Sequence, residues 1–293
     1  MKANIVDIKH LAVHDGDGIR TTVFFKGCPL KCVWCHNPES IDFGNQLGLN
    51  TERCINCLEC LVACKEGAHA EVNGIHVYNR ESCINCGECA KACLNSALTF
   101  YGKEYSVDKL LPLLLEDRIF YQTSGGGVTL SGGECLMQAD FCKEILKKLK
   151  SEGISTAVDT CGFVPTKNIE KVLPYTDVFL YDIKAIDEDV HIKCTGQSNR
   201  LILENLNYIN SMGKKIYVRV PYVPQYNDNQ IEKIAKFIKP LKNVKVAEAL
   251  SYHNFAGSKY DSLGMVNTLP KILPTGEEVE IAQDKLSDAI KGH

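Results

Sequence analysis

Three cysteines in one short run are the residues of this sequence with the clearest chemical potential. They are spaced Cys28-x3-Cys32-x2-Cys35 within the run GCPLKCVWCHN. Thiolates are the soft ligands that suit iron–sulfur chemistry, and a 4Fe–4S cluster is normally held by four of them. A loop that offers only three would leave one iron open to a small molecule. The alternatives are a zinc site and a structural cluster with a distant fourth cysteine.

A second set of cysteines forms an internal repeat. Residues 54–68 and 83–97 align without gaps at an offset of 29 residues, and each copy contains C-x2-C-x2-C-x3-C. This is the spacing of bacterial ferredoxins, in which the fourth cysteine of each copy ligates the cluster of the other copy. The repeat therefore predicts two further 4Fe–4S clusters, with zinc as the alternative. We expect the first to use Cys54, Cys57, Cys60 and Cys93, and the second Cys83, Cys86, Cys89 and Cys64.

The composition limits the classes of protein that need to be considered. The formal charge is −3 over 293 residues and no basic run is present, which argues against nucleic-acid binding. No apolar stretch approaches the ~20 residues that span a membrane, and the N-terminus has no apolar signal core. Most of the 15 cysteines stand in tight arrays, which favours metal binding over disulfides. We therefore expect a cytoplasmic, oxygen-sensitive protein.

Strand and helix patterns alternate along most of the chain. The predicted strands are residues 21–27, 126–134, 154–160, 177–184, 215–223 and 244–252. The predicted helices are residues 106–122, 138–150, 166–173, 199–212 and 228–240. Such alternation indicates a parallel sheet, and six units favour an α/β fold shaped as an open, partial (β/α)6 barrel. We expect the barrel in residues 1–49 and 105–293, with a ferredoxin-like insert at 50–104.

Polar residues stand in or at the ends of four predicted strands, where the active sites of such sheets form. They are Gly132, Gly133 and Glu134, then Asp182, Ile183 and Lys184, then Arg219, and finally His253. The glycine pair would let a ligand approach the backbone, and Glu134 could accept from an ammonium group. A simple turn, a local ion pair of Asp182 with Lys184 and a structural His253 are the alternatives.

Taken in order, these motifs resemble a known family. They are HDGDGIR (14–20), GCPLKCVWCHNPES (27–40), SGGE (131–134), DIK (182–184), RVPYVP (219–224) and LSYHNFAGSKYDSLG (250–264). The set is similar to that of the activating enzymes of glycyl radical enzymes, the radical S-adenosylmethionine family that includes pyruvate formate-lyase activase. The cysteine repeat resembles the insert of the larger subgroup, which activates dehydratases, decarboxylases and lyases.

The resemblance implies a mechanism and a set of contacts. The cluster on Cys28, Cys32 and Cys35 would reductively cleave S-adenosylmethionine to a 5′-deoxyadenosyl radical, which abstracts hydrogen from a glycine of the partner enzyme. Gly132, Gly133 and Glu134 would receive the methionine amino group, with the DIK residues Asp182 and Ile183 beside the site. Lys184, Arg219 and His253 would address the carboxylate and ribose, and Trp34, His36 and Asn37 would line the adenine side. Flavodoxin or ferredoxin would supply the electrons. The two clusters of the insert would relay these electrons, and a purely structural role for the two clusters is the alternative.

Two positions depart from the family, which usually has proline at position 17 and proline or alanine at position 135. Here Asp17 is expected to alter a loop near the mouth of the site, and Cys135 is expected to place a thiol near the cofactor. Buried packing is the default expectation for Cys135, Cys142, Cys161 and Cys194.

Two competing functions follow from the same residues. One is a radical S-adenosylmethionine enzyme that acts on a small molecule or a peptide. The other is a ferredoxin-like electron carrier, although a carrier needs no open iron.

Overall fold

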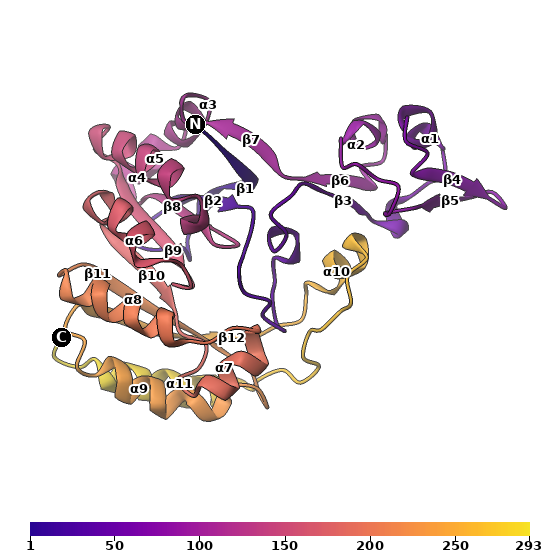
Figure 1. Ribbon diagram of the computed structural model, residues 1–293. Coiled ribbons are helices and arrows are strands. Elements are labelled where there is room, and N and C mark those ends of the chain that lie inside the picture. Colours follow the sequence, from indigo (N-terminus) through magenta and orange to yellow (C-terminus); the bar gives the residue numbers. More distant parts are fainter.

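The computed structural model describes residues 1–293, and its centre is a curved sheet of eight strands (Figure 1). The strand order is β12-β11-β10-β9-β8-β2-β1-β7. Their bounds are β1 Lys2–Ala12, β2 Arg20–Phe25, β7 Lys103–Ser106, β8 Gly127–Gly132, β9 Ser155–Thr160, β10 Val178–Asp182, β11 Lys215–Tyr222 and β12 Val244–Ser251. The run from β2 to β12 is parallel throughout. This confirms the predicted α/β fold with a partial parallel sheet.

Two strands of the sheet were not expected from the sequence. β1 pairs antiparallel with β2 and with β7, so the sheet is mixed at this edge. The run VDIK (6–9) in β1 alternates apolar and polar residues, which is the pattern of an antiparallel strand with one exposed face.

Helices cover the outer side of the curved sheet, and its concave side faces the loop after β2 (Figure 1). Their bounds are α3 Val107–Leu115, α4 Arg118–Ser124, α5 Ala139–Ser151, α6 Thr166–Val172, α7 Glu188–Thr195, α8 Arg200–Ser211, α9 Ile231–Ile238 and α11 Gly276–Ala289. Single 3-10 turns occur at Pro38–Ser40, Thr51–Arg53, Cys135–Gln138, Leu173–Tyr175 and Asp228–Gln230. None of the helices combines the length and the apolar character needed to cross a lipid bilayer.

The helix predicted at 106–122 is in fact two helices, α3 and α4, which separate before Asp117. The Asp117 carboxylate accepts a hydrogen bond from Thr21 Oγ1 at 2.5 Å and lies 2.6 Å from His10 Nδ1. The hydroxyl of Tyr121 donates to the Leu114 carbonyl at 2.8 Å, near the end of α3. These tertiary contacts compensate for the interrupted helix, and a pattern of apolar residues does not reveal them.

Three further helices were missed, namely α7, α11 and α10 (Gly257–Leu263). At the start of α11, Thr275 and Glu278 form a complete capping box, which is a signal that the sequence does contain.

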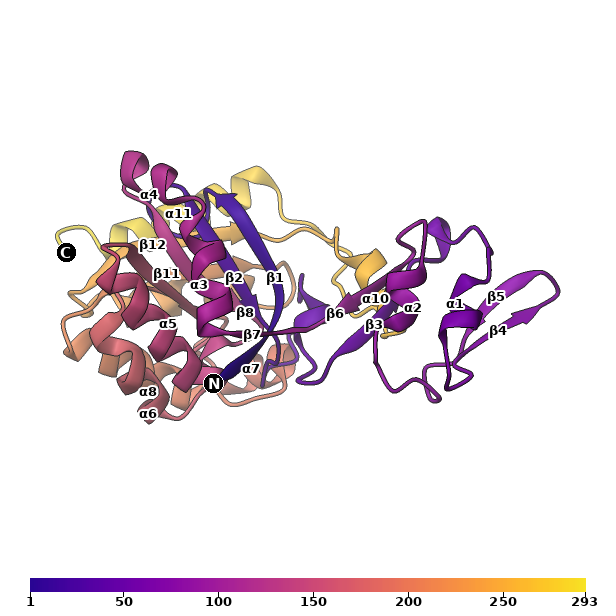
Figure 2. The ribbon, with the colours of Figure 1, turned by 90° about the horizontal axis from the view of Figure 1, so that it is seen from above.

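Residues between β3 (Gln46–Leu49) and β6 (Leu98–Tyr101) form a lobe that extends from the sheet (Figure 2). The lobe contains α1 (Glu59–Ala63), β4 (His69–Val72), β5 (Ile75–Tyr78) and α2 (Glu88–Ala92). β3 pairs antiparallel with β6, and β4 with β5.

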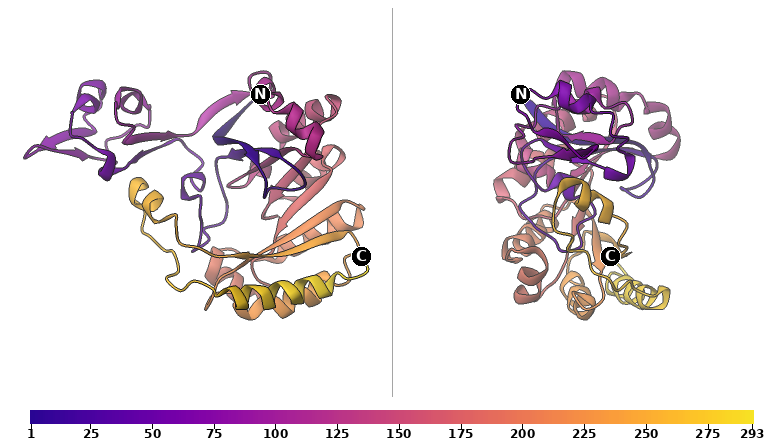
Figure 3. Two further views of the ribbon diagram at one scale, coloured as in Figure 1. Left: turned by 180° about the vertical axis from the view of Figure 1, so that it is seen from behind. Right: turned by 90° about the vertical axis from the view of Figure 1, so that its right-hand side faces the viewer.

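The short helix α10 (Gly257–Leu263) lies beside the lobe, as seen from two sides in Figures 1 and 3. Arg80 joins the two, because its guanidinium donates to the carbonyls of Leu47, at 2.9 Å, and Ser262, at 2.5 Å.

Candidate active site

The three-cysteine loop follows β2 at the carboxyl edge of the sheet, as the strand-end rule predicts. Backbone hydrogen bonds hold it to α7, since Lys31 N donates to Thr195 O at 2.8 Å and Val33 N donates to Cys194 O at 3.0 Å. Cys28 N donates to the Ile41 carbonyl at 3.0 Å. The cysteines are therefore presented by a loop whose own backbone is firmly held.

Helix α10 supports the same loop from the other side. Tyr260 Oη donates to the Cys35 carbonyl at 3.0 Å. Lys259 Nζ donates to His36 O at 3.1 Å and to Glu39 Oε1 at 2.6 Å. The Lys259–Tyr260 pair of the last sequence motif thus positions the cysteine loop, a role that sequence reasoning did not assign.

A cavity of about 880 Å³, measured with its open mouth, lies between this loop and the strand ends. The loop contributes Cys28, Cys32, Trp34, Cys35, His36 and Asn37 to its wall. The strand ends contribute Gly132, Gly133, Asp182, Lys184 and Arg219. Most of the predicted contact residues are therefore gathered around one space, next to three soft ligands.

Four charged side chains form a network on the cavity wall, of which Lys184 is buried and the other three are partly buried. Asp182 lies between two cations, 3.0 Å from Lys184 Nζ and 3.3 Å from Arg219 Nε. Arg219 also pairs with Asp159, which accepts a hydrogen bond from Ser131 Oγ at 2.6 Å. The two carboxylates balance the two cations, so the cavity presents both signs of charge side by side.

The network favours the charged forms of Asp182 and Lys184, whereas burial raises the pKa of Asp159. Burial alone would raise the pKa of Asp182, but Lys184 and Arg219 outweigh it and hold that pKa below its usual value. Burial opposes the charge of Lys184, yet the carboxylate of Asp182 raises its pKa. Such largely buried pairs cannot lose one partner without a large cost in free energy.

The structure corrects the role expected for Glu134. Its side chain is fully buried and does not line the cavity. The carboxylate accepts hydrogen bonds from Thr160 Oγ1 at 2.9 Å, Cys161 N at 2.8 Å and Leu136 N at 3.1 Å. With these donors in place it joins the ends of β8 and β9, and no oxygen is left facing a ligand.

Two other predicted contacts also lie outside the cavity wall. Ile183 is a core residue whose backbone N–H donates to Arg219 O at 3.0 Å. The ring of His253 is on the far side of His36, on which it stacks with centroids 4.0 Å apart. His253 thus supports a cavity residue instead of lining the cavity itself.

Close backbone packing explains Gly132 and Gly133, whereas the sequence suggested that they let a ligand approach the backbone. A Cβ on Gly132 would stand 2.1 Å from Phe25 N, and one on Gly133 would stand 2.5 Å from Ser40 O. Gly133 N donates to the Phe25 carbonyl at 2.9 Å. The two glycines let the end of β8 lie directly against the segment that carries the cysteines.

Sequence reasoning did not name eight of the cavity residues as contacts, and four of these are Ser131, Asp159, Thr160 and Cys161. Three of them are at the carboxyl end of β9, whose predicted range already ended in Asp159 and Thr160. The strand-end rule that selected Asp182 would have selected these residues too.

Of the four cysteines outside the arrays, Cys161 departs from the packing expectation. All four are buried, and Cys135, Cys142 and Cys194 lie outside the cavity wall. Cys161 lines the cavity, where interaction with the Cys28 thiol, together with burial, raises the pKa of Cys161. The thiol of Cys135 is directed into the protein and lies 3.4 Å from the Leu130 carbonyl.

Asp17 was expected near the mouth of the site, and the structure contradicts this. Its carboxylate pairs with Lys215, at 3.0 Å, and with the Tyr217 hydroxyl, at 2.6 Å. Lys215 begins β11, so Asp17 is at the amino edge of the parallel strands, opposite the cavity.

In the lobe, the two predicted cysteine sets surround two small cavities. Cys54, Cys57, Cys60 and Cys93 line one of about 360 Å³. Cys64, Cys83, Cys86 and Cys89 line the other, of about 290 Å³. The exchange of the fourth cysteine between repeats agrees with this arrangement.

Comparisons with known proteins agree with the geometry. The family model of the radical SAM superfamily matches residues 22–238. The chain is 47% identical over 268 residues to the trans-4-hydroxy-L-proline dehydratase activating enzyme of Clostridioides difficile, covering 90% of this chain and 88% of that one. It is 40% identical over 271 residues to the choline trimethylamine-lyase activating enzyme of Oleidesulfovibrio alaskensis, covering 90% and 87%.

A crystal structure of Streptococcus suis SuiB with the precursor peptide SuiA has a similar fold, with a TM-score of 0.54 at 13% identity. The match covers 90% of this chain and 44% of that one, and it bears on the fold alone. The family model covers the cysteine loop and most of the strand-end residues, and the relatives match nearly end to end. This chain therefore belongs to the radical SAM superfamily and, within it, to the activating enzymes of glycyl radical enzymes.

Proposed function

We propose that this protein activates a glycyl radical enzyme of the dehydratase type, and that a trans-4-hydroxy-L-proline dehydratase is the partner to test first. The observation that carries this choice is the 47% identity to the activating enzyme of that dehydratase. The activating enzymes named for choline lyase, sulfolyase and indoleacetate decarboxylase partners are 36–40% identical.

We further propose that Cys28, Cys32 and Cys35 hold a 4Fe–4S cluster and that S-adenosylmethionine binds in the adjoining cavity. The fit is supported by three thiols on one anchored loop, without a fourth cysteine from the same loop. When bound, the cluster and S-adenosylmethionine supply the radical that removes hydrogen from the partner's glycine.

The residues of the chain would bind and orient the cofactor. The network of Asp182, Lys184 and Arg219 offers both signs of charge, which suits the ammonium and carboxylate groups of the methionine moiety. Trp34, His36 and Asn37 would line the adenine side, with His253 stacked behind His36. The backbone at Gly132 and Gly133 would face the amino group, without the side chain of Glu134.

The lobe is proposed to be a ferredoxin-like insert at residues 50–104, between barrel segments 1–49 and 105–293. It would hold two more 4Fe–4S clusters, which makes three in all, and relay electrons from flavodoxin or ferredoxin. The two four-cysteine cavities support this assignment. A structural role for these clusters is the alternative.

The partner is tested by mixing the anaerobically reconstituted protein with purified candidate enzymes, S-adenosylmethionine and a reductant. We expect a glycyl radical signal in the electron paramagnetic resonance spectrum with the hydroxyproline dehydratase and a weaker or absent signal with a choline lyase. Activation of the choline lyase alone would contradict the choice of partner. Methionine release without any radical transfer would favour a different substrate.

The relay is tested with Cys57→Ser. We expect this variant to bind S-adenosylmethionine normally and to be reduced more slowly by flavodoxin, because one lobe cluster is impaired. Dithionite, which can reduce the barrel cluster directly, should restore most of the activity. Full activity of the variant with flavodoxin would mean that the lobe clusters are structural.

A further inference from the structure

The two cysteine sets of the lobe lie against different parts of the molecule. The first set lines one cavity and consists of Cys54, Cys57, Cys60 and Cys93. The second set lines the other cavity and consists of Cys64, Cys83, Cys86 and Cys89. Helix α2 carries Cys89 of the second set and α1 carries Cys60 of the first. In Figures 1 and 2, α1 is farther from the eight-stranded sheet than α2, so the second set is on the side toward the barrel.

Equivalent asparagines of the two repeats show the same difference. Asn85, in the loop of the second set, accepts a hydrogen bond from Leu47 N at 3.2 Å, and Leu47 is on β3. Asn56, at the equivalent position of the first set, accepts from His76 N at 2.9 Å, and His76 is on β5. Strand β3 follows the cysteine loop of the barrel, whereas β5 belongs to the hairpin at the far end of the lobe (Figure 2). The second set is therefore tied to the strand nearer the barrel.

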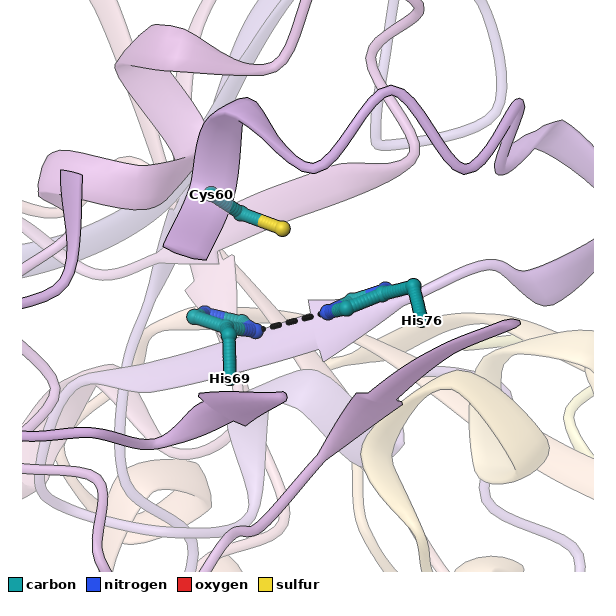
Figure 4. Close-up of side chains that lie close together, drawn as sticks. All are labelled: Cys60, His69 and His76. Carbon is teal, nitrogen blue, oxygen red and sulfur yellow. Dashed lines mark hydrogen bonds between the residues drawn. The ribbon is translucent and has the colours of Figure 1, made fainter. Parts of the chain in front are cut away.

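Two buried histidines separate the two sets. Figure 4 shows His69 of β4 and His76 of β5 facing Cys60 of the first set. A hydrogen bond of 2.8 Å joins His69 Nδ1 and His76 Nε2. His76 lines the cavity of the first set and His69 lines that of the second. The linked rings thus keep the two sets apart as two successive sites.

Arg80 fastens the segment of the second set to α10. It precedes Cys83 by three residues, and its guanidinium lies 4.8 Å from the centre of the Tyr78 ring. From there it donates to the carbonyl of Ser262 in α10, at 2.5 Å. Gly264 follows α10 with φ 66°, and a Cβ at this position would stand 2.4 Å from Arg80 Nε. The guanidinium is therefore closely enclosed between the lobe and the end of α10.

The same helix supports the three-cysteine loop of the barrel. Tyr260 Oη donates to the Cys35 carbonyl at 3.0 Å, and Lys259 Nζ donates to the His36 carbonyl at 3.1 Å. Helix α10 thus contacts the loop at one end of this connection and Arg80 at the other. Through Arg80, the position of the second set relative to the barrel loop is fixed by side-chain contacts as well as by the chain itself.

We propose that Arg80 is a positioning residue, which holds the lobe so that the second set, and not the first, delivers electrons to the three-cysteine loop. The inference rests on the proposed function, because it requires clusters at all three sites. One electron would pass from the donor protein to the first set, then to the second set and then to the barrel, each site being reduced and reoxidised in turn. Electron transfer slows steeply as two centres move apart, so a fixed lobe transfers electrons faster than a loosely attached one.

The order of the sites is tested by electron paramagnetic resonance of the full chain, reconstituted anaerobically, reduced and mixed with S-adenosylmethionine to mark the barrel signal. Two reduced clusters that lie close together broaden each other's signals. Cys86→Ser, in the second set, should abolish this broadening of the barrel signal, and Cys57→Ser, in the first set, should leave it. Each variant should retain about eight irons, against about twelve in the unaltered protein.

The role of Arg80 is tested by Arg80→Met, which removes the hydrogen bonds to α10 and β3. We expect weaker broadening of the barrel signal and several-fold slower reduction of the barrel cluster by flavodoxin. Reduction by dithionite and the affinity for S-adenosylmethionine should stay normal. Arg80→Lys keeps a cation beside Tyr78 and should restore part of both properties. Arg53→Met makes the same exchange as Arg80→Met at an exposed position of the lobe and is the control.

The contrary results separate the inference from the proposed function. Loss of the broadening in Cys57→Ser but not in Cys86→Ser would reverse the order and overturn the inference alone. Unchanged broadening in Arg80→Met, with about twelve irons bound, would overturn the role of Arg80. About four irons in the unaltered protein would overturn the cluster assignment and this inference with it. So would a zinc ion bound by Cys60, His69 and His76, whose ligand atoms lie within 4.8 Å of one another.

Discussion

The cavity between the cysteine loop and the strand ends, here called the barrel cavity, and the two cavities of the lobe are all lined by cysteines. They differ in the other residues that surround the sulfur atoms. In the barrel, three thiols share a space of about 880 Å³ with carboxylates and cations. In the lobe, four thiols line each space, of about 360 and 290 Å³, and most of the other lining residues are apolar. The four thiols of each lobe site are soft ligands, and few charged groups accompany them. The barrel site has additional room and the charged groups that a second, polar molecule would need.

The two regions also differ in how their cysteines are positioned. Distant parts of the chain hold the barrel loop, through α7 and through Lys259 and Tyr260 of α10. In the lobe, the two sequence repeats have the same local backbone conformation at equivalent positions. Asn56 and Asn85 have φ values of 55° and 53°, and Leu58 and Gly87 have φ values of 66° and 79°. The barrel site therefore depends on tertiary contacts, whereas the lobe sites depend mainly on local sequence.

The largest effect is expected from Cys32→Ala, which removes one of the three thiols of the barrel cavity. We expect complete loss of S-adenosylmethionine cleavage, because two thiolates cannot hold a cluster with an accessible iron. The lobe clusters should remain, so the iron content should fall only by about four atoms per chain. The measurement is iron analysis with an assay of methionine release. Cys142→Ala, at a buried position outside the three cysteine-lined cavities, should retain activity.

The charged wall is tested by Asp182→Asn. The change removes the carboxylate between Lys184 and Arg219, so we expect S-adenosylmethionine to bind ~10–100-fold more weakly, or about 1.4–2.8 kcal/mol. Equilibrium binding to the cluster-loaded protein measures this. The matched change Asp187→Asn, which alters an exposed ion pair, should leave the affinity unchanged. Equal affinity of both variants would contradict a role for the network in binding.

The tertiary support of the barrel loop is tested by Lys259→Met. The ammonium group bridges the loop backbone and the buried Glu39, and a hydrogen bond to a charged group contributes about 1.5–3 kcal/mol. We expect the barrel cluster to lose iron to a chelator several-fold faster, while the lobe clusters lose it at the normal rate. Lys271→Met, at an exposed site, is the control. Equal acceleration in both regions would mean a general loss of stability.

The smallest effect is expected from exchanging the left-handed residues of the repeats. Leu58 adopts φ 66°, which costs a non-glycine residue ~1–2 kcal/mol, so Leu58→Gly should stabilise the lobe by about 1 kcal/mol. Gly87→Ala should destabilise it, because its Cβ would stand 3.0 Å from the Phe100 ring. Denaturant-induced loss of lobe iron measures both. Opposite signs for the two variants would agree with a cost of the left-handed backbone at this position, and equal signs would contradict it.

Prediction from the sequence succeeded for the strands of the parallel sheet, because apolar runs between turn residues mark buried strands. It placed Asp182, Lys184 and Arg219 at the edge where the cavity lies. It failed for Asp17, because this residue precedes β2 and therefore lies at the amino edge of the sheet, opposite the cavity. The direction of β2 had to be considered to see this. It also joined α3 and α4, because the contacts of Asp117 come from residues about a hundred positions away.

The sequence by itself predicted which cysteines lie together, because the repeat and its ferredoxin spacing indicate the same two sets that line the lobe cavities. It also determined the six parallel strands and, through six ordered motifs, the family. Only the tertiary structure decided that Glu134 faces the ends of β8 and β9, that Cys161 faces the cavity and that His69 meets His76. The direction of a buried side chain depends on which distant backbone and side-chain groups satisfy its hydrogen bonds, and local sequence does not specify those partners.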